Sequence, residues 1–66
     1  MISARNQLDG TVKFVTLGTV MAEVVMDVHG VEVVAAITRH SVESMDLREG
    51  DAVKAVIKAT EVMVQK

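Results

Sequence analysis

The sequence contains no cysteine and only one aromatic residue, Phe14, among its 66 residues. The absence of cysteine excludes disulfide bonds and cysteine-rich metal sites. Half of the residues are nevertheless apolar, which leaves a surplus of valine, alanine, methionine and isoleucine to bury. A chain of this length forms one domain, residues 1–66, with a core that is marginal on its own unless partner subunits add to it. We therefore expect a homo-oligomer.

The sequence also predicts neither a targeting segment nor a membrane-spanning segment. The first residues contain no positive region that leads into an apolar run and a cleavage site, and no stretch approaches the about 20 apolar residues of a membrane span. The net charge is −2, with acidic and basic residues interspersed and no basic block. A nucleic-acid binder of the OB type would need stacking aromatics and a basic groove. We expect a cytoplasmic protein without membrane or nucleic-acid partners.

Most of the chain alternates with a period of two and is rich in β-branched residues, which indicates strands. The predicted strands contain Val12 and Phe14 on one face, then residues 20–28, 31–37, 53–57 and 62–64. The tight turn His29-Gly30 predicts an antiparallel hairpin between the second and third strands. Five short strands predict a small all-β fold, an OB-like barrel that limits exposed sheet edges.

One segment changes period, between residues 38 and 47, where Val42 and Met45 are three apart. Thr38 or Ser41 can serve as the N-cap, so a short helix is expected between strands three and four. Asp46 follows this helix and tolerates the left-handed conformation that ends many helices.

Several apolar side chains fall on the strand faces opposite the predicted core. They are Met21, Val25, Val34, Ala36 and Met63. Left in water they would form an apolar patch, so we interpret them as subunit contacts.

Three short clusters carry hydrogen-bond donors. They are Ser3-Ala4-Arg5-Asn6-Gln7, Thr38-Arg39-His40-Ser41 and Lys58-Ala59-Thr60. None of them contains a carboxylate. Hydroxyl, guanidinium, ammonium and amide groups can together surround an anion that only accepts hydrogen bonds, such as a tetrahedral oxyanion. The clusters therefore indicate anion capture.

In this order and spacing the clusters resemble those of the molybdate-binding Mop family, the small molbindins built on the TOBE fold. The resemblance covers nearly the whole chain and is carried by the strings Ser3–Leu8 with Gly10–Val12, then Ala22–Val24, Ile37–Val42 and Val56–Thr60. Two departures are the Asp46 that replaces a common glycine and the tight turn at His29-Gly30. Both lie outside the candidate ligands.

The resemblance implies that the three clusters share one oxyanion pocket between subunits of a hexamer. Thr38, Ser41 and Lys58, with the backbone around Ala59, would come from one subunit, and Ser3 and Arg5 from a neighbour. Asn6 and Thr60 are additional candidate contacts. The metal would be bound only as the oxyanion, molybdate or tungstate, without a bond from protein to metal.

Each cluster also has a simpler explanation. Residues 3–6 fit a solvated terminal segment, Thr38 and Ser41 fit helix caps, and Lys58 fits a lysine that keeps its ammonium in solvent. Capping and anion binding are compatible, because a helix start offers free N–H groups and a positive dipole.

Other functional classes have less support. His29 and His40 are isolated and lack the partners of a metal site or an oriented catalytic base. The spacing of Asp46, Glu49 and Asp51 does not fit a calcium loop, and the glycines form no phosphate-binding pattern. We predict a binding protein rather than an enzyme, which stores molybdate or tungstate and maintains its homeostasis. The alternative is a regulatory TOBE-type module that acts through a partner protein.

Overall fold

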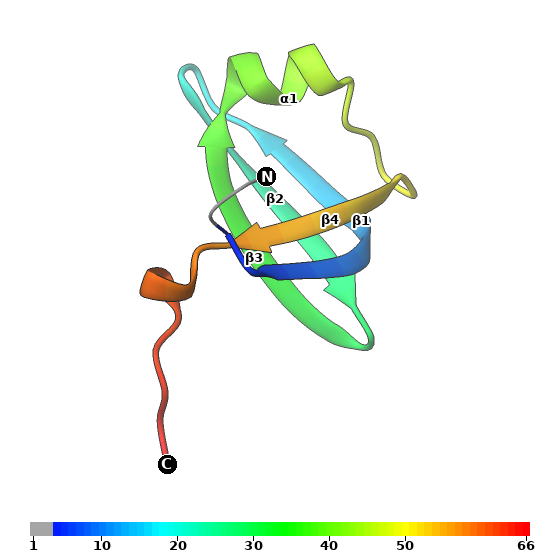
Figure 1. Cartoon of the computed structure of the whole chain (residues 1–66). Coiled ribbons are helices and arrows are strands. Elements are labelled where there is room, and N and C mark those ends of the chain that lie inside the picture. Colours follow the sequence, from blue (N-terminus) through cyan, green and yellow to red (C-terminus); the bar gives the residue numbers. More distant parts are fainter. Residues whose placement is uncertain (1–3) are drawn as a thin grey trace.

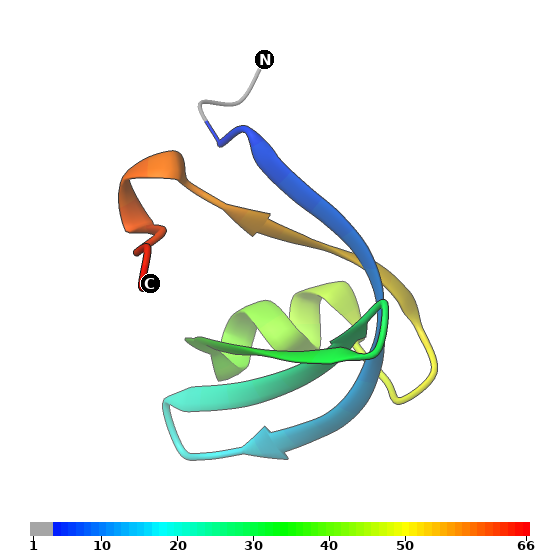
Figure 2. The same cartoon turned by 90° about the horizontal axis from the view of Figure 1, so that it is seen from below.

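The computed structural model describes residues 4–66, so the predicted ligand Ser3 lies outside the described residues. Its elements are β1 (Asn6–Leu17), β2 (Met21–Val28), β3 (Val31–Thr38), α1 (Arg39–Met45), β4 (Ala52–Ile57) and a single turn of 3-10 helix, η1 (Ala59–Glu61). The strands form one antiparallel sheet in the order β3-β2-β1-β4, which curves strongly while α1 lies at one end of it (Figures 1 and 2). The small all-β class and the helix between β3 and β4 are confirmed.

The predicted five-stranded barrel is not formed by this chain. Four strands are present among residues 4–66, and the sheet is not closed between β3 and β4. Residues 62–64, the predicted fifth strand, follow η1 outside the sheet and extend away from it (Figure 1). Within residues 4–66, this valine-containing segment pairs with no strand of its own chain.

The long strand β1 joins the two halves of the sheet. Its first half, residues 6–11, pairs with β4, and its second half, 11–17, pairs with β2. Gly10 lies where these halves meet, and a Cβ there would stand 2.7 Å from the carbonyl oxygen of Asp27. Glycine therefore permits the close approach of β1 and β2 at this bend.

A β-bulge between Val12 and Phe14 corrects the prediction that these two residues share a face. Val12 is 2% exposed in the core, whereas Phe14 is 52% exposed on the other face. One extra residue, Lys13, shifts the alternation by one position and turns Phe14 outward.

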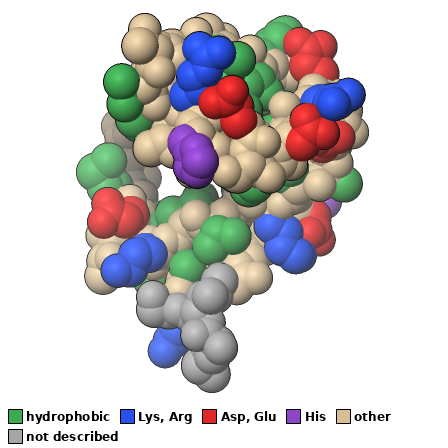
Figure 3. All heavy atoms as spheres, turned by 90° about the horizontal axis from the view of Figure 1, so that it is seen from above, with side chains coloured by type: hydrophobic (Ala, Val, Ile, Leu, Met, Phe, Trp, Pro, Cys, Tyr) green, Lys and Arg blue, Asp and Glu red, His purple; other side chains and the backbone are tan. Residues whose placement is uncertain are grey.

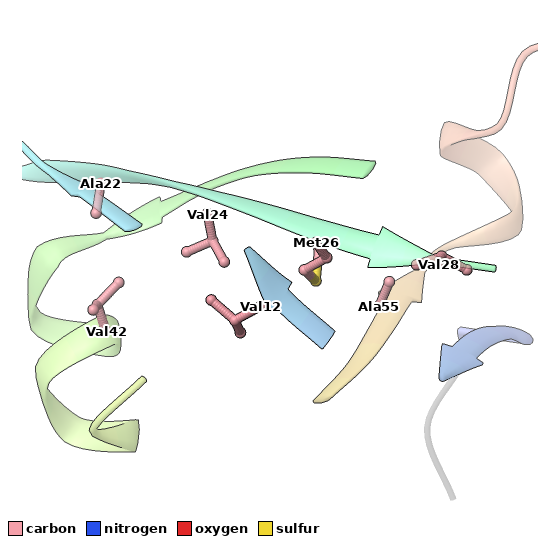
Figure 4. Close-up of a cluster of buried hydrophobic side chains, with 7 residues drawn as sticks. All are labelled: Val12, Ala22, Val24, Met26, Val28, Val42 and Ala55. Carbon is pink, nitrogen blue, oxygen red and sulfur yellow. The ribbon is translucent and has the colours of Figure 1, made fainter. Parts of the chain in front are cut away.

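The core lies inside the curve of the sheet and consists of small aliphatic side chains (Figure 4). Its buried members are Val12, Ala22, Val24, Met26, Val28, Val42 and Ala55. The even positions of β2 face this core, as the alternation predicts, and Val42 adds the buried side of α1.

Turns and caps follow the local sequence. His29 and Gly30 both adopt positive φ, 51° and 85°, the combination that a tight two-residue hairpin requires. Thr38 caps α1, since its hydroxyl oxygen accepts from the Ser41 N–H at 3.1 Å. Asp46 ends the helix in the left-handed conformation, with φ 50°, as predicted.

Candidate functional site

The first and third clusters meet at one end of the β1–β4 ladder. Asn6 pairs with Ile57, Arg5 directly precedes Asn6, and Lys58 directly follows Ile57. Antiparallel pairing thus brings two cations from opposite ends of the sequence to the same end of the sheet. The half-buried Asn6 belongs to a strand, so this part of the first cluster is not a solvated terminal segment.

Arg5 and Lys58, the two cations at this end of the sheet, differ from most other cations in forming no ion pair within residues 4–66. Within residues 4–66, the ion pairs use Lys13 with Glu32, Arg39 with Glu43, Arg48 with Asp46 and Lys54 with Asp9. Arg5 and Lys58 take part in none of these pairs, and both are exposed. Their charges are therefore available to an anion.

Ala59 and Thr60 follow Lys58 in η1. Lys58 has extended backbone, and its carbonyl oxygen accepts from the Glu61 N–H at 2.9 Å. Lys58, Ala59 and Thr60 are all exposed. All the donors of the third cluster therefore lie on one short, exposed segment.

The second cluster lies where β3 passes into α1. Thr38 is both the last residue of β3 and the helix cap, and its hydroxyl donates to the Ser41 Oγ at 2.8 Å. Since Thr38 supplies the hydrogen of that bond, the Ser41 hydroxyl keeps its own hydrogen for another acceptor.

A shallow hollow of about 480 Å³ adjoins this cluster. It is lined by Thr19, Val20, Thr38, Arg39, His40 and Glu43. Arg39 donates to the Gly18 carbonyl oxygen at 3.3 Å and lies 3.7 Å from the Glu43 carboxylate, so much of its charge is already used. Sequence reasoning did not assign Thr19 to this hollow; its only signal was the position beside the turn that leads into β2.

A larger opening separates β3 from β4, with a volume of about 730 Å³. Its lining is mostly aliphatic and includes Ile37, next to the second cluster, and Lys58, in the third. Thr38 and Ser41 do not line it, and Lys58 does not line the shallow hollow. One chain therefore brings Arg5, Asn6 and Lys58 to one end of the sheet and leaves Thr38, with Ser41 hydrogen-bonded to it, beside a separate hollow.

Charges of both signs are mixed on the face that carries α1 (Figure 3). In the part of the chain that the structure describes, no cluster of three or more histidine, cysteine or acidic side chains could hold a metal ion. No helix there is long and apolar enough to cross a membrane.

Curated relatives match this chain over most of their length. A family model described as the TOBE domain matches residues 2–64. Molybdenum-pterin-binding protein 3 of Clostridium pasteurianum is 47% identical over 64 residues, which are 96% of this chain and 94% of that protein. The probable molybdenum-pterin-binding protein of Haemophilus influenzae is 42% identical over 64 residues, 96% of this chain and 93% of that protein.

Solved structures agree with these sequence matches. A molybdate-binding protein from Sporomusa ovata is 56% identical with a TM-score of 0.97, covering 100% of this chain and 98% of that one. The cytoplasmic molybdate-binding protein ModG, with molybdate bound, is 42% identical with a TM-score of 0.84, covering 89% of this chain and 43% of that one. On sequence and structure together, the chain belongs to the TOBE domain family and, within it, to the Mop proteins, or molbindins.

Proposed function

We propose that this protein binds molybdate or tungstate as the intact oxyanion, at sites between the subunits of a homo-oligomer. The observation that carries the proposal is the pair of cations, Arg5 and Lys58, at one end of the β1–β4 ladder without carboxylate partners among residues 4–66. The relatives named for binding molybdate or molybdenum-pterin support the choice of ligand.

The donor chemistry suits a tetrahedral dianion. The guanidinium and ammonium supply charge, and the hydroxyls of Ser41 and Thr60 with the backbone N–H groups near Ala59 supply directed donors. Thr38 would hold the Ser41 hydroxyl in place through its own hydrogen bond to the Ser41 Oγ. Ser3 and Asn6 would complete the ligand set. Hydrogen bonds to oxygen suffice, so no protein atom needs to bond to the metal.

Placing the sites between subunits follows from the separation of the clusters. Thr38 lines one hollow of the chain and Lys58 lines another, so a neighbouring copy is needed to surround an anion on all sides. The exposed apolar residues Met21, Val34 and Met63 give such a copy surfaces to cover. We propose a hexamer that stores molybdate in the cytoplasm and maintains its homeostasis by binding rather than by catalysis.

Native mass spectrometry of the purified protein tests this proposal. We expect an oligomer that gains several molybdate or tungstate masses in the presence of equal sulfate. Arg5→Ala and Lys58→Ala should each reduce the uptake at least tenfold. Lys54→Ala is the matched control, because the Lys54 ammonium is already paired with the Asp9 carboxylate at 2.7 Å.

Three results would contradict the proposal. The first is a protein that takes up no oxyanion. The second is equal uptake of sulfate and molybdate. The third is a Lys54→Ala variant that loses as much uptake as Lys58→Ala, because the effect would then reflect general surface charge rather than a site.

A further inference from the structure

The shallow hollow beside Thr38 contains one carboxylate among groups that favour an anion. Its lining includes Thr19 and Thr38, which carry hydroxyls, and the basic residues Arg39 and His40. In the described part of the chain, Glu43 is the only acidic residue that lines it. An ionised carboxylate accepts hydrogen bonds and donates none, so it repels a fully ionised oxyanion and offers it no bond. Glu43 therefore opposes the ligand that the other polar groups of the hollow suit.

Arg39 is held at this hollow by the turn that leads into β2. Its backbone N–H donates to the Val20 carbonyl oxygen at 2.8 Å. Its side-chain Nη1 donates to the Gly18 carbonyl oxygen at 3.3 Å. Both acceptors are uncharged backbone groups. The turn thus holds both ends of Arg39 without help from Glu43.

The contact between Arg39 and Glu43 is electrostatic and is not a hydrogen bond. The Arg39 Nε and the Glu43 Oε1 lie 3.7 Å apart on successive turns of α1. This distance is within the range of an ion pair but too long for a hydrogen bond. An arginine side chain has five N–H donors, and the one hydrogen bond of this side chain in the described residues goes to Gly18. Glu43 therefore neutralises the guanidinium while most of its donors remain available to a ligand.

We propose that Glu43 limits the affinity of the oxyanion site by opposing the positive charge of Arg39. An oxyanion held by the Ser41 hydroxyl beside Thr38 would accept from the free Arg39 donors, while the Glu43 carboxylate repels it. The affinity then reflects a balance between one guanidinium and one carboxylate of the same helix. Such a balance favours a ligand that is released as readily as it is taken up.

This role of Glu43 rests on the proposed function, because it concerns the affinity of the same site. It adds Arg39 to the groups that contact the oxyanion and identifies a residue that acts against binding. Removing a carboxylate from a protein of net charge −2 favours any anion slightly, wherever the carboxylate lies. The test must therefore separate a local effect from a general one.

Equilibrium dialysis against molybdate at low ionic strength makes this separation with two matched variants. Glu43→Gln removes the charge and keeps the length of the side chain, and we expect molybdate to bind about threefold to tenfold more tightly. Glu32→Gln is the control, because Glu32 is also ion-paired, with Lys13 at 2.7 Å, and is similarly exposed. It lies at the other end of β3, about 20 Å along the strand from Thr38, and should change the affinity by less than about twofold.

Arg39→Gln should act in the opposite direction and weaken the binding of molybdate about threefold or more. Circular dichroism checks that the variants fold, which we expect because the Arg39–Glu43 pair is exposed and contributes little stability. An Arg39→Gln variant that folds and binds molybdate as tightly as the unmodified protein would overturn the proposal. Equal gains in Glu43→Gln and Glu32→Gln would overturn it as well.

Salt provides a readout that a purely structural role of Glu43 would not change. The gain in Glu43→Gln should largely disappear between about 0.01 M and about 1 M sodium chloride, because the Debye length falls from about 30 Å to about 3 Å. A gain that persists in high salt would contradict an electrostatic role. If the unmodified protein binds molybdate but Glu43→Gln gains nothing, the proposed function stands and the role of Glu43 is refuted. If the unmodified protein and every variant take up no molybdate, both proposals fail.

Discussion

At the scale of single residues, Thr38 and Ser41 have different roles at the start of α1. The sequence alone could not tell which of them caps the helix and which is free to donate to a ligand. The Thr38 oxygen accepts from the Ser41 N–H and its hydroxyl donates to the Ser41 Oγ, so Thr38 is occupied with the helix start. The Ser41 side chain is not needed for that cap. The simpler interpretation as a helix cap is thus correct for Thr38, while Ser41 keeps a donor for a ligand.

Ser41→Ala therefore separates binding from stability. The variant keeps the backbone N–H that caps α1, so we expect its free energy of unfolding to change by less than about 0.5 kcal/mol. Its affinity for molybdate should fall about tenfold, since one charge-assisted hydrogen bond is lost. Urea unfolding and equilibrium dialysis measure the two effects. A variant that loses stability and affinity together would assign Ser41 to the helix instead.

A second residue-scale prediction concerns acid. The Lys54 ammonium donates a hydrogen bond to Asp9, which together with its positive charge holds the pKa of that carboxyl below its ordinary value of 3.8. The ionised form is thereby favoured in the folded state. The pair contributes stability above pH 3.8, and this contribution is lost as the pH falls through the lowered pKa.

Asp9→Asn should accordingly unfold at a lower urea concentration than the unmodified protein at pH 7, by a small margin because the pair is exposed. The difference should shrink at pH 3 and below. Urea unfolding curves at both values measure it. A difference that stays the same as the pH falls would mean that the amide, rather than the lost charge, destabilises the variant.

At the scale of elements, the core inside the curved sheet depends on a few aliphatic side chains. Val12 is 2% exposed and lies among residues of β2, β4 and α1, whereas Val20 before β2 is 70% exposed. We expect Val12→Ala to lower the free energy of unfolding by about 2 kcal/mol, from lost burial and the cavity that remains. Val20→Ala should change it by less than about 0.5 kcal/mol. Equal losses in thermal or urea unfolding would contradict this view of the core.

The positions of strands, turns and helix ends were predictable where they depend on residues close together in the sequence. The alternation of β2, the turn at His29-Gly30, the cap at Thr38 and the left-handed Asp46 all depend on neighbours in sequence. The bulge at Lys13 was not predictable, because it depends on how β1 meets β2. A single inserted position reversed the face of Phe14.

For the candidate site, the sequence predicted which residues carry donors but not how the fold brings them together. The meeting of Arg5 and Asn6 with Lys58 results from the β1–β4 register, which no local pattern contains. The resemblance to the Mop proteins supplied the grouping that the residues alone did not. A pocket that joins the hollow beside Thr38 to that end of the sheet would need a neighbouring copy, so the geometry of a single chain does not contain it.

At the scale of the whole molecule, apolar surface exceeds what one chain of 66 residues can bury. The outer face of the sheet exposes Phe14, Met21 and Val34, and the segment after η1 exposes Met63 and Val64. Small domains without disulfides depend on such surface being covered by partners. In the proposed oligomer, folding and association would be one equilibrium, because the separated subunit would expose its incomplete sheet.

Thermal unfolding should therefore depend on protein concentration. Mass action favours the folded oligomer by about 1.4 kcal/mol for each tenfold rise in concentration of a released partner. We expect the midpoint, measured by circular dichroism, to rise by several degrees over a hundredfold increase in concentration. A midpoint independent of concentration would show that the subunit is stable alone, and the exposed valines and methionines would then need another explanation.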